Sequence, residues 1–189
     1  MLFAGRLGAN DVSKVNEKPF TRHWLAFVVL LIALCLDGSL SHVLGQWTML
    51  PLNTGVPQLT LLAFVLIGIY VPRESWLLGW SVLFGLLYDS YYTGMLGVHA
   101  FIFPALVYLL MMIRPYIPRT WPFVLALYVI LLTVSAVMNY VFAIFINETT
   151  IDLLQMVAQH MGPSFEINLI LFAILYYPCS RLLVKLSTD

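Results

Sequence analysis

Three acidic side chains lie inside apolar stretches of this sequence. They are Asp37, Asp89 and Glu166. A carboxylate is unfavourable in such surroundings, so its presence there requires an explanation. A charged side chain at the centre of a bilayer costs about 2.5–3.5 kcal/mol on insertion scales. One interpretation is a proton-linked or cation-binding cluster inside a helical bundle. The other is three groups near the membrane interface, hydrated or bonded to polar neighbours, and we favour it because residues close to span ends can reach water.

Sequence motifs for catalysis, phosphate binding or metal binding are missing. The sequence has no Gly-rich phosphate loop with its Lys, no pair of metal-binding His on a helix and no Gly-x-Ser-x-Gly motif. Its two cysteines, Cys35 and Cys179, fall in apolar runs, and its four histidines have no repeated ligand spacing. We therefore expect no cofactor, no metal ion and no enzymatic activity.

Composition excludes a water-soluble globular domain. The chain has 189 residues, of which 61% are hydrophobic and 10% are charged. An ordinary soluble domain is about 45–50% apolar and about 25% charged. Nine Lys and Arg residues balance nine Asp and Glu residues, so no bulk positive charge suggests binding to nucleic acid. The helices that position the three carboxylates must therefore lie in a membrane.

Six apolar stretches approach the roughly 20 residues that a helix needs to cross a hydrocarbon core of about 30 Å. They cover residues 24–41, 56–71, 75–92, 98–113, 122–146 and 165–184. We predict an all-α integral membrane protein with six transmembrane helices. Its parts would be a cytoplasmic N-terminal segment over residues 1–23, a transmembrane domain over residues 24–186 and a cytoplasmic tail over residues 187–189.

The positive charges predict the orientation of these helices, because Lys and Arg near a span stay in the cytoplasm. All nine fall on the side of the two termini: Arg6, Lys14, Lys18, Arg22, Arg73, Arg114, Arg119, Arg181 and Lys185. The three opposite connections contain none. Both termini are therefore predicted to be cytoplasmic, which places the three carboxylates toward the outer face.

The third span carries the strongest pattern of small and polar residues. Those that share one helix face, at i, i+3, i+4 and i+7, are Gly85, Tyr88, Asp89 and Tyr92. The glycine would let a neighbouring helix approach closely. The two phenols could donate hydrogen bonds to the carboxylate. In the fifth span, Asn139 belongs to a small and polar stripe that suits a hydrogen bond between helices.

Two short elements stand at the junction of the third and fourth spans. The first is Gly85-Leu86-x-x-Asp89, and the second is Leu96-Gly97-x-x-Ala100. Together they resemble the signature of the MreD family of bacterial rod shape-determining proteins, to which the length and six spans are also similar. From the residues themselves, Gly94 and Gly97 suit a tight turn. Leu96 would cover this turn, and Asp89 would cap or anchor the preceding helix.

The resemblance implies a non-enzymatic scaffold subunit of the elongation machinery in the bacterial plasma membrane. Such a protein would bind MreC, and would support lateral peptidoglycan synthesis by RodA and its class B penicillin-binding protein partner. The surface offered to MreC would include residues 41–55, residues 93–97 and the segment after Asn147. In that segment, apolar residues at three- and four-residue spacing predict a short helix on the outer surface.

The MreD family also resembles in fold the substrate-binding S-components of energy-coupling-factor transporters. That likeness supplies the alternative, a small-molecule-binding transport subunit with Asp37, Asp89, Asn139 and Glu166 lining a cavity open to the outside. An intramembrane enzyme would need a nucleophile or a metal ligand set, and none can be named. The candidate residues for packing or partner binding are Asp37, Gly85, Tyr88, Asp89, Tyr92, Leu96, Gly97, Asn139 and Glu166.

Overall fold

The computed structural model describes residues 23–50, 53–71, 74–94, 96–145 and 161–188. Six α-helices dominate this part of the chain: α1 (His23–Thr48), α2 (Leu59–Tyr70), α3 (Leu77–Tyr88), α4 (Val98–Ile113), α5 (Trp121–Phe145) and α7 (Gly162–Thr188). A π-helical turn, Asp89–Thr93, prolongs α3, and a 3₁₀ turn, Arg114–Tyr116, follows α4. Two short strands, β1 (Met49–Leu50) and β2 (Asn53–Thr54), pair antiparallel. The fold is therefore mainly helical, with one small hairpin that the all-α prediction did not include.

Some predicted segments fall outside the described residues. The short surface helix predicted after Asn147 lies almost entirely in residues 146–160, and the N-terminal segment lies almost entirely in residues 1–22. The chain that was predicted to form a C-terminal tail from residue 187 is helical as far as Thr188, where α7 ends.

Four of the helices are long and apolar enough to cross a membrane: Trp24–Val43, Val98–Tyr116, Trp121–Phe145 and Gly162–Val184. The predicted second span differs, because residues 55–58 are not helical and only α2 follows. At 1.5 Å per residue, α2 is about 18 Å long, which is shorter than a hydrocarbon core of about 30 Å. Helix α2 alone is therefore too short to cross such a core.

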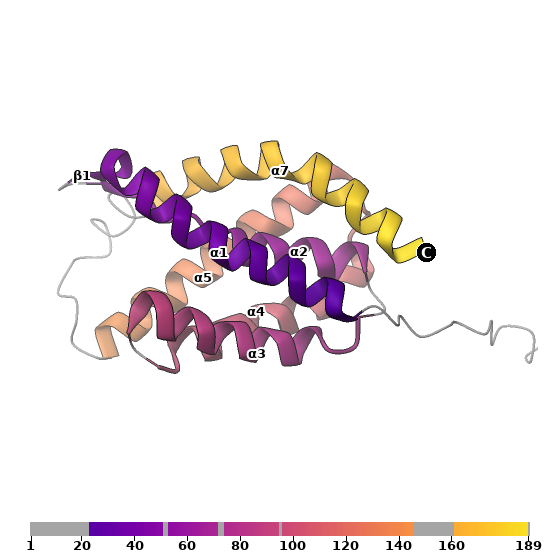
Figure 1. The fold of residues 1–189 in the computed structure, drawn as a ribbon, viewed down its shortest axis with the longest axis horizontal. Coiled ribbons are helices and arrows are strands. Elements are labelled where there is room, and N and C mark those ends of the chain that lie inside the picture. The colour runs from indigo at the N-terminus through magenta and orange to yellow at the C-terminus, as the bar shows by residue number, and fades with distance from the viewer. Residues whose placement is uncertain (1–22, 51–52, 72–73, 95, 146–160, 189) are drawn as a thin grey trace, which may run out of the picture.

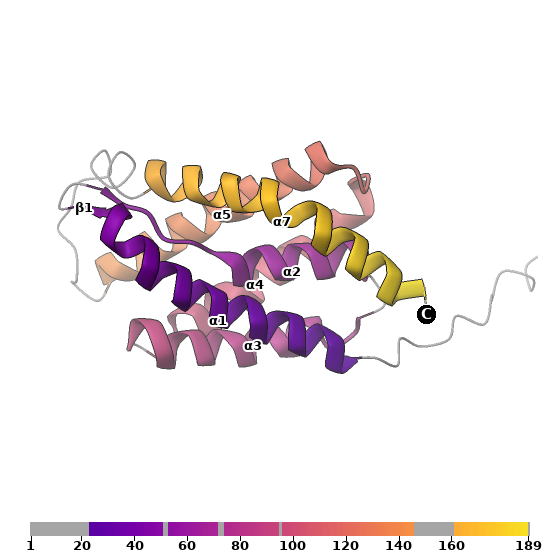
Figure 2. The ribbon, with the colours of Figure 1, turned by 45° about the horizontal axis from the view of Figure 1, so that its top comes forward.

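The short helix α2 is the centre of the bundle. All 12 of its residues are buried, and it packs against α1, α4, α5 and α7 (Figure 1 and Figure 2). Its sequence is apolar on every face, as expected for a helix that is covered all round. Aromatic rings fill the neighbouring core, where Tyr128, Phe172 and Tyr176 stack in a row between α5 and α7.

The outside of the bundle carries large apolar side chains. Ile32, Phe101, Phe123 and Ile174, from four different helices, are each more than half exposed. An apolar surface of this extent is unusual on a soluble monomer and suits contact with lipid. The distribution of apolar residues therefore agrees with a membrane-embedded bundle.

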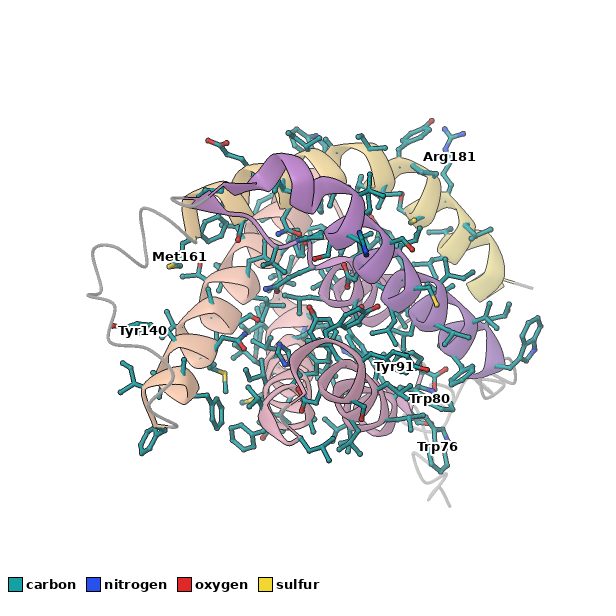
Figure 3. All side chains as sticks on the ribbon, turned by 60° about the vertical axis from the view of Figure 1, so that its left-hand side comes forward. Trp76, Trp80, Tyr91, Tyr140, Met161 and Arg181 are labelled. Atoms are coloured by element: carbon teal, nitrogen blue, oxygen red, sulfur yellow. The ribbon has the colours of Figure 1, made fainter. Side chains whose placement is uncertain are left out.

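The start of α1 and the C-terminal end of α7 lie at the same end of the bundle (Figure 1). Three tryptophans at or just before the starts of α1, α3 and α5, Trp24, Trp76 and Trp121, are each 61–62% exposed. Trp76 and Arg181 point outward from the bundle (Figure 3). Exposed tryptophans at helix ends suit the headgroup region, and the shared position of the start of α1 and the end of α7 agrees with an even number of crossings.

Candidate functional site

Asp89 lies at the C-terminal end of α3, and its carboxylate binds the start of α4. Its oxygens accept hydrogen bonds from the backbone N–H groups of Gly97, His99 and Ala100, at 2.8–3.1 Å. The Nδ1 atom of His99 lies 2.9 Å from Oδ1 of Asp89. The first N–H groups of a helix have no partner within that helix. Asp89 occupies the C-cap position of α3, as predicted, and its side chain also caps the start of α4.

The two tyrosines near Asp89 do not donate to it in the described part of the chain, contrary to the prediction. The Tyr92 hydroxyl donates to the carbonyl of Leu34 in α1, at 2.8 Å. The Tyr88 ring packs on the His99 ring, with 4.4 Å between centroids. The carboxylate turns toward α4 at the end of the helix and finds its partners there. The tyrosines thus join α3 to α1 and to α4.

Helices α3 and α4 approach each other closely at Gly85. A Cβ atom at this position would lie 2.5 Å from the carbonyl oxygen of His99 and 2.6 Å from Cα of Ala100. Backbone atoms cannot move aside cheaply, so the contact requires glycine. Gly85 is therefore the packing point that brings the start of α4 within reach of the Asp89 carboxylate.

The turn between α3 and α4 uses two residues with left-handed backbone. Gly94 has a φ of 67° and Gly97 has a φ of 114°, and glycine adopts such angles without steric cost. Leu96, which is predicted to cover this turn, is 72% exposed. Asp89 holds the turn from the inside, and this leaves Leu96 projecting from it.

A second carboxylate, Asp37 in α1, caps α2 in the same way. It accepts hydrogen bonds from the backbone N–H groups of Leu59 and Thr60 and from the Thr60 hydroxyl, the last at 2.6 Å. Asp37 is 2% exposed and Asp89 is 0% exposed. Neither is a hydrated interfacial group, and the backbone of the next helix satisfies each of them.

The chain enters α2 through residues 55–58, whose backbone is bound by α5 and α7. Oδ1 of Asn168 accepts the N–H of Gln58 at 2.8 Å, and Nδ2 of Asn168 donates to the carbonyl of Val56 at 2.9 Å. The Tyr128 hydroxyl donates to the carbonyl of Gln58 at 3.2 Å. Non-helical backbone inside a membrane needs such internal partners, because lipid offers none. Asn168 and Tyr128 therefore allow α2 to begin within the bundle.

A small cavity adjoins Asp37 and the Asp89–His99 pair. Its lining residues are Asp37, Gln58, Thr60, Leu61, Tyr88, His99 and Phe103. Its volume is about 10 Å³, whereas one water molecule needs roughly 10–15 Å³ on the same measure and ligand pockets occupy about 300–1,000 Å³. Of the four residues predicted to line a ligand cavity, only Asp37 lines this one.

The remaining two predicted site residues stand apart from the caps. Asn139 donates to the carbonyl of Ser135 in its own helix, at 3.0 Å, and not to any other helix among the described residues. Glu166 lies in the first turns of α7 and is exposed. The three carboxylates therefore do not form one cluster: two are buried helix caps, and the third is at the surface.

A family model supports the resemblance seen in the sequence. The model described as rod shape-determining protein MreD matches residues 18–186. The chain belongs to the MreD family. Compared with curated proteins and with solved structures, it matches none of either. Its four long apolar helices and its family make this MreD protein a membrane protein of the cell-shape-determining class.

Several residues of this MreD family member that complete the two caps were not singled out from the sequence. Asn168 is a polar residue within the last apolar stretch, and that position was a signal that it binds something inside the bundle. Thr60 gave no such signal, because its partner Asp37 precedes it by 23 residues. The spacing of the four histidines predicts no metal site, and it gives no sign that His99 contacts Asp89. Within the described residues, no group of three or more His, Cys, Asp and Glu side chains could hold a metal ion.

A third buried acid in this MreD chain also lies at the start of a helix. Glu74 is 1% exposed, and its Oε1 atom accepts the N–H of Trp76, which directly precedes α3, at 3.0 Å. Helices α2, α3 and α4 therefore each begin beside a buried carboxylate. Negative charge is favourable at this end of a helix, because the helix dipole is positive there.

Proposed function

We propose that this chain is a non-enzymatic scaffold subunit of the bacterial elongation machinery, the elongasome, in the plasma membrane. It would bind MreC and thereby support lateral peptidoglycan synthesis by RodA and its class B penicillin-binding protein partner. Family membership supports the role in cell shape. An S-component-like arrangement of the six helices, with both termini in the cytoplasm, is part of the same proposal.

The observation that carries this proposal is the turn between α3 and α4. Asp89 fixes its backbone from the inside, while Leu96 and Tyr91 project outward with 72% and 78% of their surface exposed. Apolar and aromatic side chains on a fixed backbone favour association, because little conformational entropy is lost when a partner covers them. The family resemblance leads us to expect MreC, a single-span protein with an outer domain, as that partner.

The test is co-purification of the intact chain with MreC. We expect Leu96→Ser to weaken the association by about tenfold, which corresponds to ~1.4 kcal/mol of lost contact. Tyr116→Ser is the matched control, since Tyr116 is 86% exposed in the 3₁₀ turn after α4, at the opposite end of that helix. Both variants should accumulate equally in membranes. Full recovery of MreC with the Leu96→Ser chain would remove the basis of the proposal.

The orientation is open to an independent test. The structure describes three Arg residues: Arg114 and Arg119 follow the C-terminal end of α4, and Arg181 lies in the C-terminal part of α7. Positively charged residues near a span stay on the cytoplasmic side. Reporter fusions at the two chain ends should both be active in the cytoplasm. A reporter active on the outer side at either end would contradict this topology.

The alternative is a small-molecule-binding transport subunit of the S-component kind. The observation that bears on it is the cavity beside Asp37, which is polar but holds only about 10 Å³. A ligand that binds the native state would raise the unfolding temperature, and the rise would grow with the logarithm of its concentration once this exceeds the Kd. We expect no such rise with vitamin-sized compounds, and a clear rise would favour the transport role instead.

A further inference from the structure

The cavity beside Asp37 is polar for its size. Five of its lining residues carry polar groups: Asp37 from α1, Gln58 just before α2, Thr60 from α2, Tyr88 from α3 and His99 from α4. The side chains of Asp37, Tyr88 and His99 belong to residues that are 2–9% exposed. Bulk water therefore cannot solvate these groups freely, and each must find its hydrogen-bond partners inside the bundle.

One lining residue has a buried acceptor atom to which no described side chain or backbone group donates a hydrogen bond. The Oε1 atom of Gln58 is buried and has no partner within the part of the chain that the structure describes. The backbone of the same residue is fully used, because its N–H is bound by Asn168 and its carbonyl by Tyr128. A buried acceptor without a partner is destabilising, and native proteins commonly satisfy such atoms with ordered water.

Two neighbours can complete the hydrogen bonds of a water molecule. His99 directs Nδ1 to the Asp89 carboxylate; with the proton on Nδ1, its Nε2 atom is an acceptor. The Tyr88 hydroxyl has no hydrogen bond to any other residue that the structure describes, and it can donate. A buried water typically makes about three hydrogen bonds. Gln58, His99 and Tyr88 together offer two acceptors and one donor.

We propose that the cavity binds one ordered water molecule. It donates to Oε1 of Gln58 and to Nε2 of His99, and it accepts from the Tyr88 hydroxyl. The volume of about 10 Å³ matches a single water rather than a larger ligand. This water links the Asp37 cap of α2 to the Asp89–His99 cap of α4 across the centre of the bundle.

The first test uses Gln58→Met, which removes Oε1 and leaves the backbone bonds to Asn168 and Tyr128 possible. With a water in the cavity, the variant displaces it or removes one of its partners, and the midpoint of thermal unfolding in detergent falls by about 2–4 °C. With an empty cavity, the same change removes an unpaired acceptor, so the midpoint stays the same or rises. The second result would overturn the proposal.

The second test measures coupling between two side chains that both line the cavity and would both bind the water. Gln58→Met and Tyr88→Phe should shift the midpoint less in combination than the sum of their separate shifts. Tyr108→Phe is the matched control, because Tyr108 lies on α4, is 59% exposed and does not line the cavity. It should combine additively with Gln58→Met. Additive shifts for the Tyr88 pair as well would overturn the proposal.

A high-resolution experimental structure of the unaltered chain would show the water directly, and this test does not require any variant to fold. We expect one water peak within hydrogen-bond distance of Oε1 of Gln58. An empty cavity, or a metal cation coordinated there, would overturn the proposal.

Discussion

Asp37 and Asp89 have the same role in two regions of the molecule, one between α1 and α2 and the other between α3 and α4. Asp37 lies near the middle of α1 and Asp89 at the end of α3, and each binds N–H groups at the start of the next helix. The regions differ in the chain between the partners: Leu59 follows Asp37 by 22 residues, whereas Gly97 follows Asp89 by only 8.

This difference decides what else each cap requires. The Asp89 cap is local, and its turn needs only the two glycines with positive φ and the close approach at Gly85. The Asp37 cap is not local, because the chain before α2 is held by Asn168 and Tyr128 from α5 and α7. The α3–α4 hairpin can therefore form from neighbouring residues, while the α1–α2 junction depends on the assembled bundle.

The largest expected effect is that of Asp37→Ala. The change leaves two backbone N–H groups and the Thr60 hydroxyl buried without an acceptor, and each such donor costs about 1–3 kcal/mol. We expect the free energy of unfolding to fall by about 3 kcal/mol or more, measured by thermal unfolding in detergent and by abundance in membranes. Asp37→Asn, which keeps one acceptor oxygen, should lose less. An alanine variant as stable as the parent would show that α2 does not need this cap.

The next effect tests the close approach on which the local cap depends. In Gly85→Ala the new Cβ meets backbone atoms of His99 and Ala100 at 2.5–2.6 Å, so α3 and α4 must separate at a cost of about 1–3 kcal/mol. Gly79→Ala, in the same helix, is the matched control, because the nearest atom to its Cβ lies at 3.6 Å. Equal unfolding temperatures for the two variants would contradict a tight α3–α4 contact.

Asp89→Ala should cost less than Asp37→Ala, although both remove a helix cap. Loss of an N-cap typically costs about 0.5–2 kcal/mol, and the turn beside Asp89 is exposed at Leu96 and Gly97, so water can reach some of the freed N–H groups. The variant should also weaken MreC recovery, since the turn loses its support. Thermal unfolding and co-purification measure the two effects. An unfolding loss larger than that of Asp37→Ala would reverse the comparison between the two regions.

The sequence predicted the helices well where each helix is a full span. The predicted fourth span, residues 98–113, has the same bounds as α4, and the MreD resemblance is confirmed by the family model. The second span was predicted too long, because hydropathy does not distinguish a buried helix from a buried extended segment. Pro57 was the available signal, since the residue before a proline favours extended backbone.

The sequence could identify Asp89 but not the direction of its hydrogen bonds. Helical spacing places Tyr88 and Tyr92 on the same face as Asp89, yet the end of a helix lets the carboxylate turn to the next one. The sequence could not predict the partners of Asp37, because Thr60 contacts it only in the folded bundle. Spacing can therefore locate a local cap residue but not its hydrogen-bond partners, whereas both the position and the partners of a distant cap depend on how all the helices pack.

The smallest expected effect is that of Glu166→Gln. It tests whether an acid at the surface contributes less to stability than an acid that caps a helix. Glu166 is exposed on α7, so replacing its carboxylate by an amide should change the free energy of unfolding by less than about 0.5 kcal/mol. Asp37→Asn makes the same chemical change at a site that is 2% exposed. Because an amide has one acceptor oxygen where a carboxylate has two, we expect a clear loss there and none at Glu166 in thermal unfolding. A loss at Glu166 comparable to that at Asp37 would mean that charge, and not the hydrogen bonds to the next helix, determines the stability of these acids.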